Sequence, residues 1–121
     1  MPTAPLEDTR WRVASIGATA VPRATRPPFL LLAPSDGRHL LGGWSGCQAI
    51  RGHYDIVAGR LRLSLSPPTT PAACAEAPAA LEAKLRKALQ ATANYRIRGT
   101  RLDLLSADGK VLARFTEAPK P

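Results

Sequence analysis

Short segments in which apolar and polar residues alternate recur along this chain, separated by turns rich in glycine or proline. The clearest are RLRLSL at Arg60–Leu65 and YRIR at Tyr95–Arg98. Successive side chains of a β-strand point to opposite faces, so these segments place leucine, tyrosine and isoleucine on one face and arginine on the other. The pattern therefore predicts an antiparallel sheet with one buried face and one face in water.

Eight segments are expected to be strands, because they are apolar or alternating and are bounded by turn residues. They are Trp11–Ile16, Phe29–Ala33, His39–Trp44, Ile50–Ile56, Arg60–Leu65, Tyr95–Ile97, Leu102–Leu105 and Val111–Phe115. Ser35–Gly37 and Ala58–Gly59 are expected to close two hairpins. Gly42–Gly43 lies inside a predicted strand and indicates a bulge or a sharp bend there.

A single helix is expected near residues 78–93, after a proline-rich segment at Pro67–Pro71 that a central strand cannot contain. Its apolar stripe consists of Leu81, Leu85, Ala88 and Leu89. Glu82 and Arg86 are expected to face water as an i,i+4 pair. Eight short strands and one late helix predict a mainly β (α+β) fold: a curled antiparallel sheet or cracked β-barrel whose open side the helix covers.

The length of the chain fits one domain. It has 121 residues, 45% of them hydrophobic, and a chain of this size buries roughly two thirds of its unfolded surface. We expect one domain at 6–116, with a disordered lead at 1–5 and a disordered tail at 117–121. No apolar run approaches the ~20 residues of a membrane helix, so no transmembrane segment is expected. Neither a signal peptide nor a lipobox is visible, which fits a cytoplasmic protein or an exported one whose signal has been removed.

The net charge of +8 raises the question of a polyanionic partner. Arginine supplies thirteen of the seventeen basic residues. Arg60, Arg62, Arg96 and Arg98 share the polar face of the alternating strands, as a solvated surface or as a candidate binding face for nucleic acid or lipopolysaccharide phosphate. Nucleic acid is disfavoured, because its site would place stacking aromatic residues among the arginines. Here the aromatic residues fall mainly on the apolar side.

The two cysteines leave several interpretations open. Cys47 as a nucleophile would need a base, and His53 with Asp55 is the candidate pair, but no oxyanion-hole loop or helix follows Cys47. A zinc site from both cysteines, His39 and His53 lacks the usual ligand spacing. The other two interpretations are a disulfide between Cys47 and Cys74 and two unlinked buried thiols. Catalysis and metal binding are therefore disfavoured on the residues alone.

A series of short motifs runs through the chain in a definite order. They are Leu6, Thr9 and Trp11; Asp36–Gly37; Gly42, Ser45, Gly46, Cys47, Gly52 and Tyr54; Thr69–Thr70 and Cys74; Leu81, Leu85 and Leu89; then Tyr95, Ile97, Leu102, Asp108–Gly109 and Phe115. This order resembles the META domain, also called the HslJ-like family of heat-shock and envelope proteins. The resemblance covers nearly the whole chain. Two positions depart from it, because Gln48 replaces an asparagine and Ala73 replaces a methionine.

The resemblance implies a compact antiparallel β domain with one helix. Bacterial members are commonly exported, often as lipoproteins, so a periplasmic or outer-membrane location is expected. They have been linked to heat-shock response, antibiotic tolerance or motility. The implied fold is also similar to the cracked barrel of secretin pilot proteins, which bind lipid or a partner's peptide tail. No enzymatic activity is established for the family, so the resemblance supplies no catalytic residue, cofactor or metal.

With an exported family in view, we expect a disulfide between Cys47 and Cys74. Closing a loop of 26 intervening residues would stabilise the fold by roughly 3.5 kcal/mol in the chain-entropy model. Trp44 is the candidate exposed aromatic residue at a groove. The leading hypothesis is a monomeric, non-enzymatic envelope domain that binds a protein segment or lipid, and polyanion binding and a cysteine-based enzyme are the alternatives.

Overall fold

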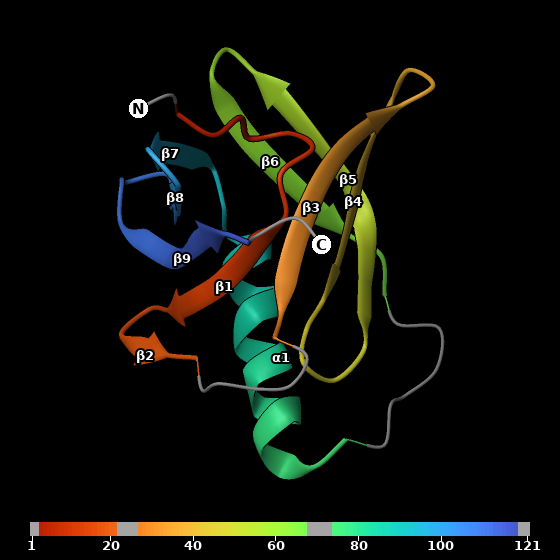
Figure 1. Cartoon of the computed structure of the whole chain (residues 1–121), viewed down its shortest axis with the longest axis vertical. Helices are drawn as coiled ribbons and strands as arrows, with labels where there is room; N and C mark the ends of the chain where they lie inside the picture. Colours follow the sequence, from red (N-terminus) through yellow and green to blue (C-terminus); the bar gives the residue numbers. More distant parts are fainter. Residues whose placement is uncertain (1–2, 22–26, 68–73, 119–121) are drawn as a thin grey trace.

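The chain forms one antiparallel sheet that curls into a barrel, with a single helix against it (Figure 1). The computed structural model describes residues 3–21, 27–67 and 74–118. Within these ranges the strands are β1 (Trp11–Ile16), β2 (Thr19–Ala20), β3 (Phe29–Ser35), β4 (Arg38–Trp44), β5 (Ala49–Val57), β6 (Arg60–Leu65), β7 (Asn94–Arg98), β8 (Arg101–Leu105) and β9 (Val111–Glu117). The helix α1 spans Glu76–Gln90. All eight predicted strands are present, and β2 is an additional short one.

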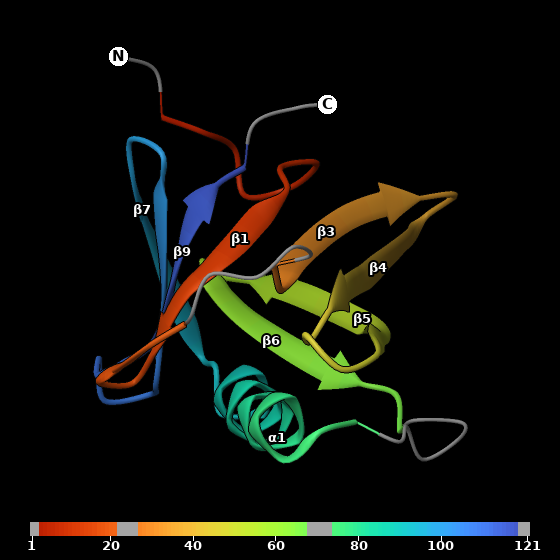
Figure 2. The same cartoon turned by 60° about the horizontal axis from the view of Figure 1, so that its bottom comes forward.

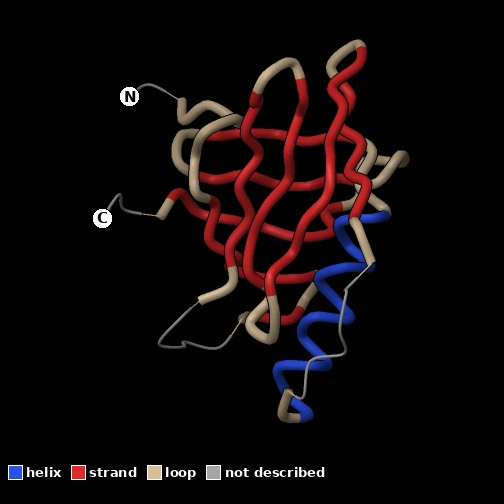
Figure 3. Tube along the Cα trace, turned by 90° about the vertical axis from the view of Figure 1, so that its right-hand side faces the viewer, coloured by secondary structure: helices blue, strands red, loops and turns tan. Residues whose placement is uncertain are grey.

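The strand order makes the barrel nearly closed. Eight strands follow one another as β6-β5-β4-β3-β1-β9-β8-β7, and β2 pairs only with β1. Figure 3 shows the two halves of the sheet crossing each other at a steep angle. The two end strands, β6 and β7, meet where the sheet fails to close, and we call this place the seam. The predicted mainly β cracked barrel is therefore confirmed.

Local turn chemistry explains why two hairpins form where the sequence predicts them. Asp36 and Gly37 have φ angles of 50° and 76°, and Ala58 and Gly59 have φ angles of 53° and 78°. Positive φ at both central residues is the signature of the type I′ turn, whose twist matches that of the flanking strands. Glycine and aspartate adopt this conformation readily, whereas alanine at position 58 does so at a cost.

Gly42 and Gly43 form no bulge, so this part of the prediction is wrong. Gly42 and Gly43 pair in unbroken register with β3 on one side and β5 on the other. The reason for glycine at position 43 is space, because a Cβ atom there would lie 2.3 Å from the carbonyl oxygen of Phe29. The register shifts lie elsewhere, between Val13 and Ser15 and between Leu104 and Leu105.

Helix α1 packs against β6, β9 and β1, beneath the seam (Figure 2). It begins two residues earlier and ends three residues earlier than predicted. Leu85, Ala88 and Leu89 are buried as expected, but Glu82 is buried too, at 9% exposure, and the prediction that it faces water is wrong. No helix in the described ranges is long and apolar enough to cross a membrane.

Side chains fill the barrel interior. The largest that are fully buried include Trp11, Tyr54, Phe115, Leu30, Leu32, Leu61, Leu85, Leu89, Leu102 and Leu104. Trp11 and Tyr54 therefore lie in the core as predicted. Tyr95 is only half-buried, since it lies on the end strand β7 beside the seam. Because the interior holds packed side chains, any ligand site has to lie on the outside of the barrel or at the seam.

Candidate functional site

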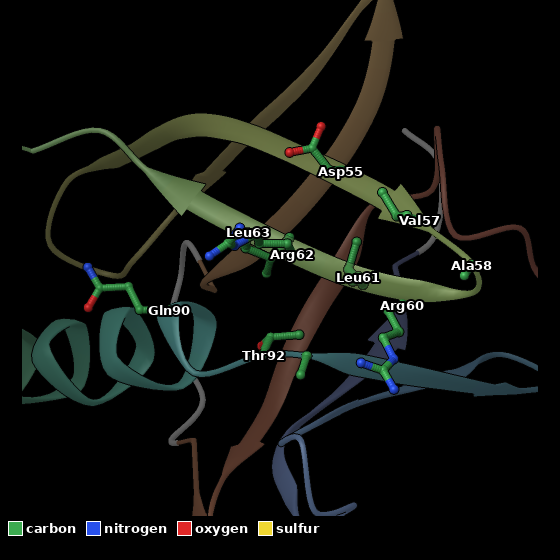
Figure 4. Close-up of a pocket in the computed structure, with 10 residues that line it drawn as sticks. Asp55, Val57, Ala58, Arg60, Leu61, Arg62, Leu63, Gln90 and Thr92 are labelled. Atoms are coloured by element: carbon green, nitrogen blue, oxygen red, sulfur yellow. The ribbon is translucent and has the colours of Figure 1, made fainter.

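A groove of about 840 Å³ lies at the seam, between the β5–β6 hairpin and the end of α1 (Figure 4). It is lined by Asp55, Val57, Ala58, Arg60, Leu61, Arg62, Leu63, Gln90, Thr92 and Ala93. The groove exists because the chain leaves α1 and enters β7 through Thr92 and Ala93. Thr92 Oγ1 donates to the carbonyl oxygen of Ala88 at 2.9 Å, and this bond holds Thr92 against the last turn of the helix.

The edge of β6 forms one wall of this groove. Main-chain groups of an antiparallel strand point alternately to its two sides. The N–H of Ser66 donates to the Arg51 carbonyl of β5, and the N–H of Leu61 donates across the seam to the carbonyl oxygen of Ala93 at 3.1 Å. The same alternation turns the main-chain groups of Leu63 toward the seam. Among the described residues, the Leu61–Ala93 bond is the single backbone hydrogen bond between β6 and the far side of the groove.

The groove wall mixes apolar and charged side chains. Val57 is 70% exposed, which is high for a large apolar residue on a strand. Asp55 pairs with Arg62, and Val57 pairs with Arg60, on the outer face of the hairpin. The predicted basic residues Arg60 and Arg62 therefore share the outer face of the hairpin with an acid and an exposed apolar residue.

The other two predicted basic residues, Arg96 and Arg98, lie on β7, where an acid that the sequence analysis did not single out organises the outer face. Asp103 on β8 is 1% exposed, and its Oδ2 accepts from Arg96 Nη2 at 2.9 Å. Its Oδ1 lies 3.7 Å from Arg101 Nε and 3.6 Å from Arg114 Nε. Three guanidinium groups thus share one carboxylate and leave this face positively charged.

The structure decides between the interpretations of the two cysteines. Cys47 and Cys74 form a disulfide, with their Cα atoms 5.7 Å apart, as predicted. The bond ties the β4–β5 loop to the start of α1. Within that loop, Ser45 Oγ accepts from the main-chain N–H groups of Cys47 and Gln48, each at 3.0 Å. The sulfur of Cys47 therefore forms a structural disulfide and is not available as a nucleophile.

Gln48, which departs from the family pattern, explains why Glu82 is buried. Gln48 Nε2 donates to Glu82 Oε1 at 2.7 Å, and Arg86 Nε lies 3.1 Å from the same oxygen. A buried carboxylate needs such partners, because burial removes its hydration. The loop and the helix are thus joined twice, by the disulfide and by this polar contact.

The histidines do not assemble a catalytic or metal centre with the cysteines. His39 stacks on Tyr54 with ring centroids 5.1 Å apart, while His53 and Asp55 are exposed on the outer face of β5. No group of three or more metal-binding side chains is found in the part of the chain that the structure describes. Among the residues that the structure describes, Tyr54 has a strongly raised pKa. Burial raises it, and the hydrogen bond that its phenol donates to Glu7 Oε2 adds to the increase.

Trp44 does not line the seam groove. It lies on the outer face of β4, opposite Phe29 of β3, and it is half-buried. The Phe29 ring also carries the guanidinium of Arg10, 3.9 Å from its centroid. The sequence analysis predicted an exposed aromatic residue here but assigned it to a groove, since it could not show which residue of the neighbouring strand lies opposite.

Comparison with known proteins now places the fold. A sequence model of the META domain matches residues 4–119. This chain belongs to the META domain family. No curated protein matches this META domain significantly.

Solved structures agree with the META fold. An NMR structure of a protein from Burkholderia xenovorans is similar over 95% of this chain and 85% of its own, with 24% identity and a TM-score of 0.74. A crystal structure of a DUF4847 family protein from Bacteroides vulgatus is similar over 96% of both chains, with 14% identity and a TM-score of 0.65. At these identities the likeness shows the fold alone.

In this META domain the family motif residues hold the fold together. Trp11 Nε1 donates to the Leu6 carbonyl at 3.0 Å inside the core. Gly46 has a φ of 95° in the β4–β5 loop, and Gly52 lies against the backbone of β6. Tyr54 is in the core and Cys47 is bonded to Cys74, and none of the motif residues that the structure describes lines the seam groove. Thr69, Thr70 and Ala73 lie outside the described residues.

Proposed function

We propose that this META domain is a non-enzymatic binding protein of the bacterial cell envelope and that its seam groove holds an extended segment of a partner protein. The observation that carries the proposal is the edge of β6. There the main-chain groups of Leu61 and Leu63 face a groove of about 840 Å³ that is crossed by one backbone hydrogen bond. An extended peptide can add to such an edge as a further strand.

The chemistry of the groove favours a peptide over an alkyl chain. Asp55, Arg60, Arg62 and Gln90 all line it, and a hydrocarbon chain would leave them without partners. A peptide would satisfy the edge of β6 with its own main chain and place alternate side chains against Val57 and the polar groups. Val57 is 70% exposed and can therefore contact an apolar side chain of that segment.

An envelope location is supported by the Cys47–Cys74 disulfide, since such bonds persist mainly in oxidising compartments. The same bond supports a non-enzymatic role, because it uses the sulfur of Cys47, which was the candidate nucleophile. By analogy with the family, the domain would support stress or antibiotic tolerance. Binding of nucleic acid is less favoured, since Arg96 is paired with Asp103 and Arg62 lies opposite Asp55.

The test is selection of short random peptides, displayed on phage, against the oxidised domain, followed by NMR mapping of a selected peptide. The amide signals of Leu61, Leu63 and Ala93 are expected to shift most, and the Leu63 amide is expected to become protected from hydrogen exchange. Shifts confined to the opposite side of the barrel would contradict the proposal.

A pair of matched variants makes the test specific. Val57→Lys places a charge in the groove at a residue that is 70% exposed, and Leu40→Lys places the same charge on β4 at a residue that is 38% exposed. Both positions are on the surface, so both variants are expected to fold. Val57→Lys is expected to weaken peptide binding at least tenfold, while Leu40→Lys leaves it unchanged. Equal effects of the two would show that the peptide does not occupy the groove.

A further inference from the structure

A row of five outward-facing residues crosses the barrel wall away from the seam. The strand register pairs Arg101 with Thr116, Thr116 with Arg12, Arg12 with Phe29, and Phe29 with Trp44. Directly opposed residues on neighbouring strands have Cβ atoms about 5 Å apart. We call these five residues the outer row. It brings residues 12, 29, 44, 101 and 116 side by side, with arginines at one end and aromatic rings at the other.

The aromatic end of the outer row lies within a wider apolar surface. Leu31 and Ala33 share the outer face of β3 with Phe29 and are half-buried, and Leu40 on β4 is 38% exposed. Phe29 and Trp44 are themselves half-buried, so part of each ring is accessible. A sheet face that turns aromatic and aliphatic side chains outward is unusual in a domain whose interior is already filled, and it indicates an interaction surface.

The arginines at the basic end of the outer row keep their positive charge accessible to solvent. Arg12 and Arg101 are exposed, and Arg10 lies over the Phe29 ring at 3.9 Å. Asp103 faces the Nε atoms of Arg101 and Arg114, and their side chains remain 46% and 47% exposed. One buried carboxylate thus orients several guanidinium groups without neutralising them all.

We propose that the outer row and its surroundings dock on the surface of a membrane that contains anionic lipids. Arginine binds lipid phosphate with its planar fork of donors, and aromatic side chains favour the zone between headgroups and hydrocarbon. The aliphatic neighbours Leu31 and Leu40 match acyl chains, whereas a nucleic acid would offer them no apolar partner. The proposal concerns a different surface from the seam groove and does not depend on what the groove binds.

The test is co-sedimentation of the oxidised domain with vesicles of phosphatidylcholine alone and with about one third phosphatidylglycerol. Binding is expected to the anionic vesicles and to weaken with rising salt. Tryptophan fluorescence gives a second readout, because Trp11 is fully buried and Trp44 is not. Emission is expected to shift to the blue on binding, and the shift is expected to disappear in Trp44→Phe while binding remains.

Variants that each remove one positive charge test whether the arginines bind the lipid. Arg12→Gln and Arg101→Gln are each expected to weaken vesicle binding about fivefold, the factor that corresponds to about 1 kcal/mol per basic residue. Lys84→Gln removes one positive charge from an exposed position of α1 and is expected to bind like the parent. Circular dichroism checks that each variant is folded. Equal binding to neutral and anionic vesicles, equal effects of the three variants, or tighter binding to single-stranded oligonucleotide at the same salt would each overturn the proposal.

Discussion

Gly52 lies so close to Ser64 that a Cβ atom on the glycine would be 2.1 Å from the carbonyl oxygen of Ser64. The two residues belong to β5 and β6, the hairpin that carries the seam groove. Contact this close leaves no room for any side chain at position 52, because the obstacle is backbone and cannot rotate away. Position 52 therefore has space only for glycine, and this close contact holds β6 against β5 while the other edge of β6 faces the groove.

Gly52→Ala is accordingly expected to lower the free energy of unfolding by about 2 kcal/mol, since an added methyl group has to displace the backbone of β6. Urea denaturation measures the change. Gly42→Ala is the matched control, because its Cβ atom would meet nothing within 4 Å and its expected effect is within about 0.5 kcal/mol. Similar losses in both variants would contradict the importance of the close approach.

Removing the disulfide with Cys47→Ala and Cys74→Ala together is expected to lower the free energy of unfolding by about 3.5 kcal/mol, because the unfolded chain regains the freedom of the closed loop. The comparison is of denaturation midpoints with and without reductant. Reductant is expected to destabilise the parent and to leave the double variant unchanged. A parent that is indifferent to reductant would show that the bond contributes nothing to stability.

Ala58 has a φ of 53°, which costs an alanine about 1 kcal/mol relative to residues that tolerate the left-handed region. Ala58→Asn is therefore expected to raise the free energy of unfolding by about 0.5 to 1 kcal/mol, since asparagine suits the first position of a type I′ turn. Ala107→Asn, in a different exposed turn, serves as the control and is expected to change little. Thermal unfolding followed by circular dichroism gives both values.

The raised pKa of Tyr54 predicts how stability changes in alkali. The unfolded phenol loses its proton near its ordinary pKa of 10.0, while burial and the bond to Glu7 keep the folded phenol protonated to higher pH. Above about pH 10 the unfolded state therefore binds fewer protons, and the free energy of unfolding falls as pH rises. Below that pH this contribution is fully present.

Tyr54→Phe is expected to flatten that fall, because phenylalanine cannot ionise in either state. It is also expected to cost about 1 to 2 kcal/mol at neutral pH through loss of a hydrogen bond to a carboxylate. Urea midpoints between pH 8 and pH 11 test this, with Tyr95→Phe as the control that retains the fall. If the fall were as steep in Tyr54→Phe as in the parent, another group would be responsible.

Local signals in the sequence are enough to predict most of the fold. Period-2 alternation and the turns at Asp36–Gly37 and Ala58–Gly59 identify the hairpins, because a two-residue turn determines its own register. The helix position follows from its leucine spacing. The disulfide could be predicted because the chain has only two cysteines and resembles a family whose members are commonly exported.

The candidate sites depend on contacts between distant parts of the chain, which one sequence does not reveal. Glu82 is buried by Gln48, which lies 34 residues earlier. Asp103 lies between Leu102 and Leu104, and the period-2 pattern therefore predicts that it is exposed. Its burial follows from arginines on β7 and β9 that only the strand order brings beside it. The outer row likewise exists only once β1 is known to lie between β9 and β3.

The strand order also fixes how the two proposed surfaces are oriented. Counting from the seam, β3 is the fourth strand in one direction and β1 is the fourth in the other. The Arg12–Phe29 pair, which joins these two strands, is thus as far around the barrel from the groove as the chain allows. A domain resting on a bilayer by this pair would hold its groove open toward the aqueous compartment. It would act as an adaptor that can engage a soluble partner without first leaving the membrane.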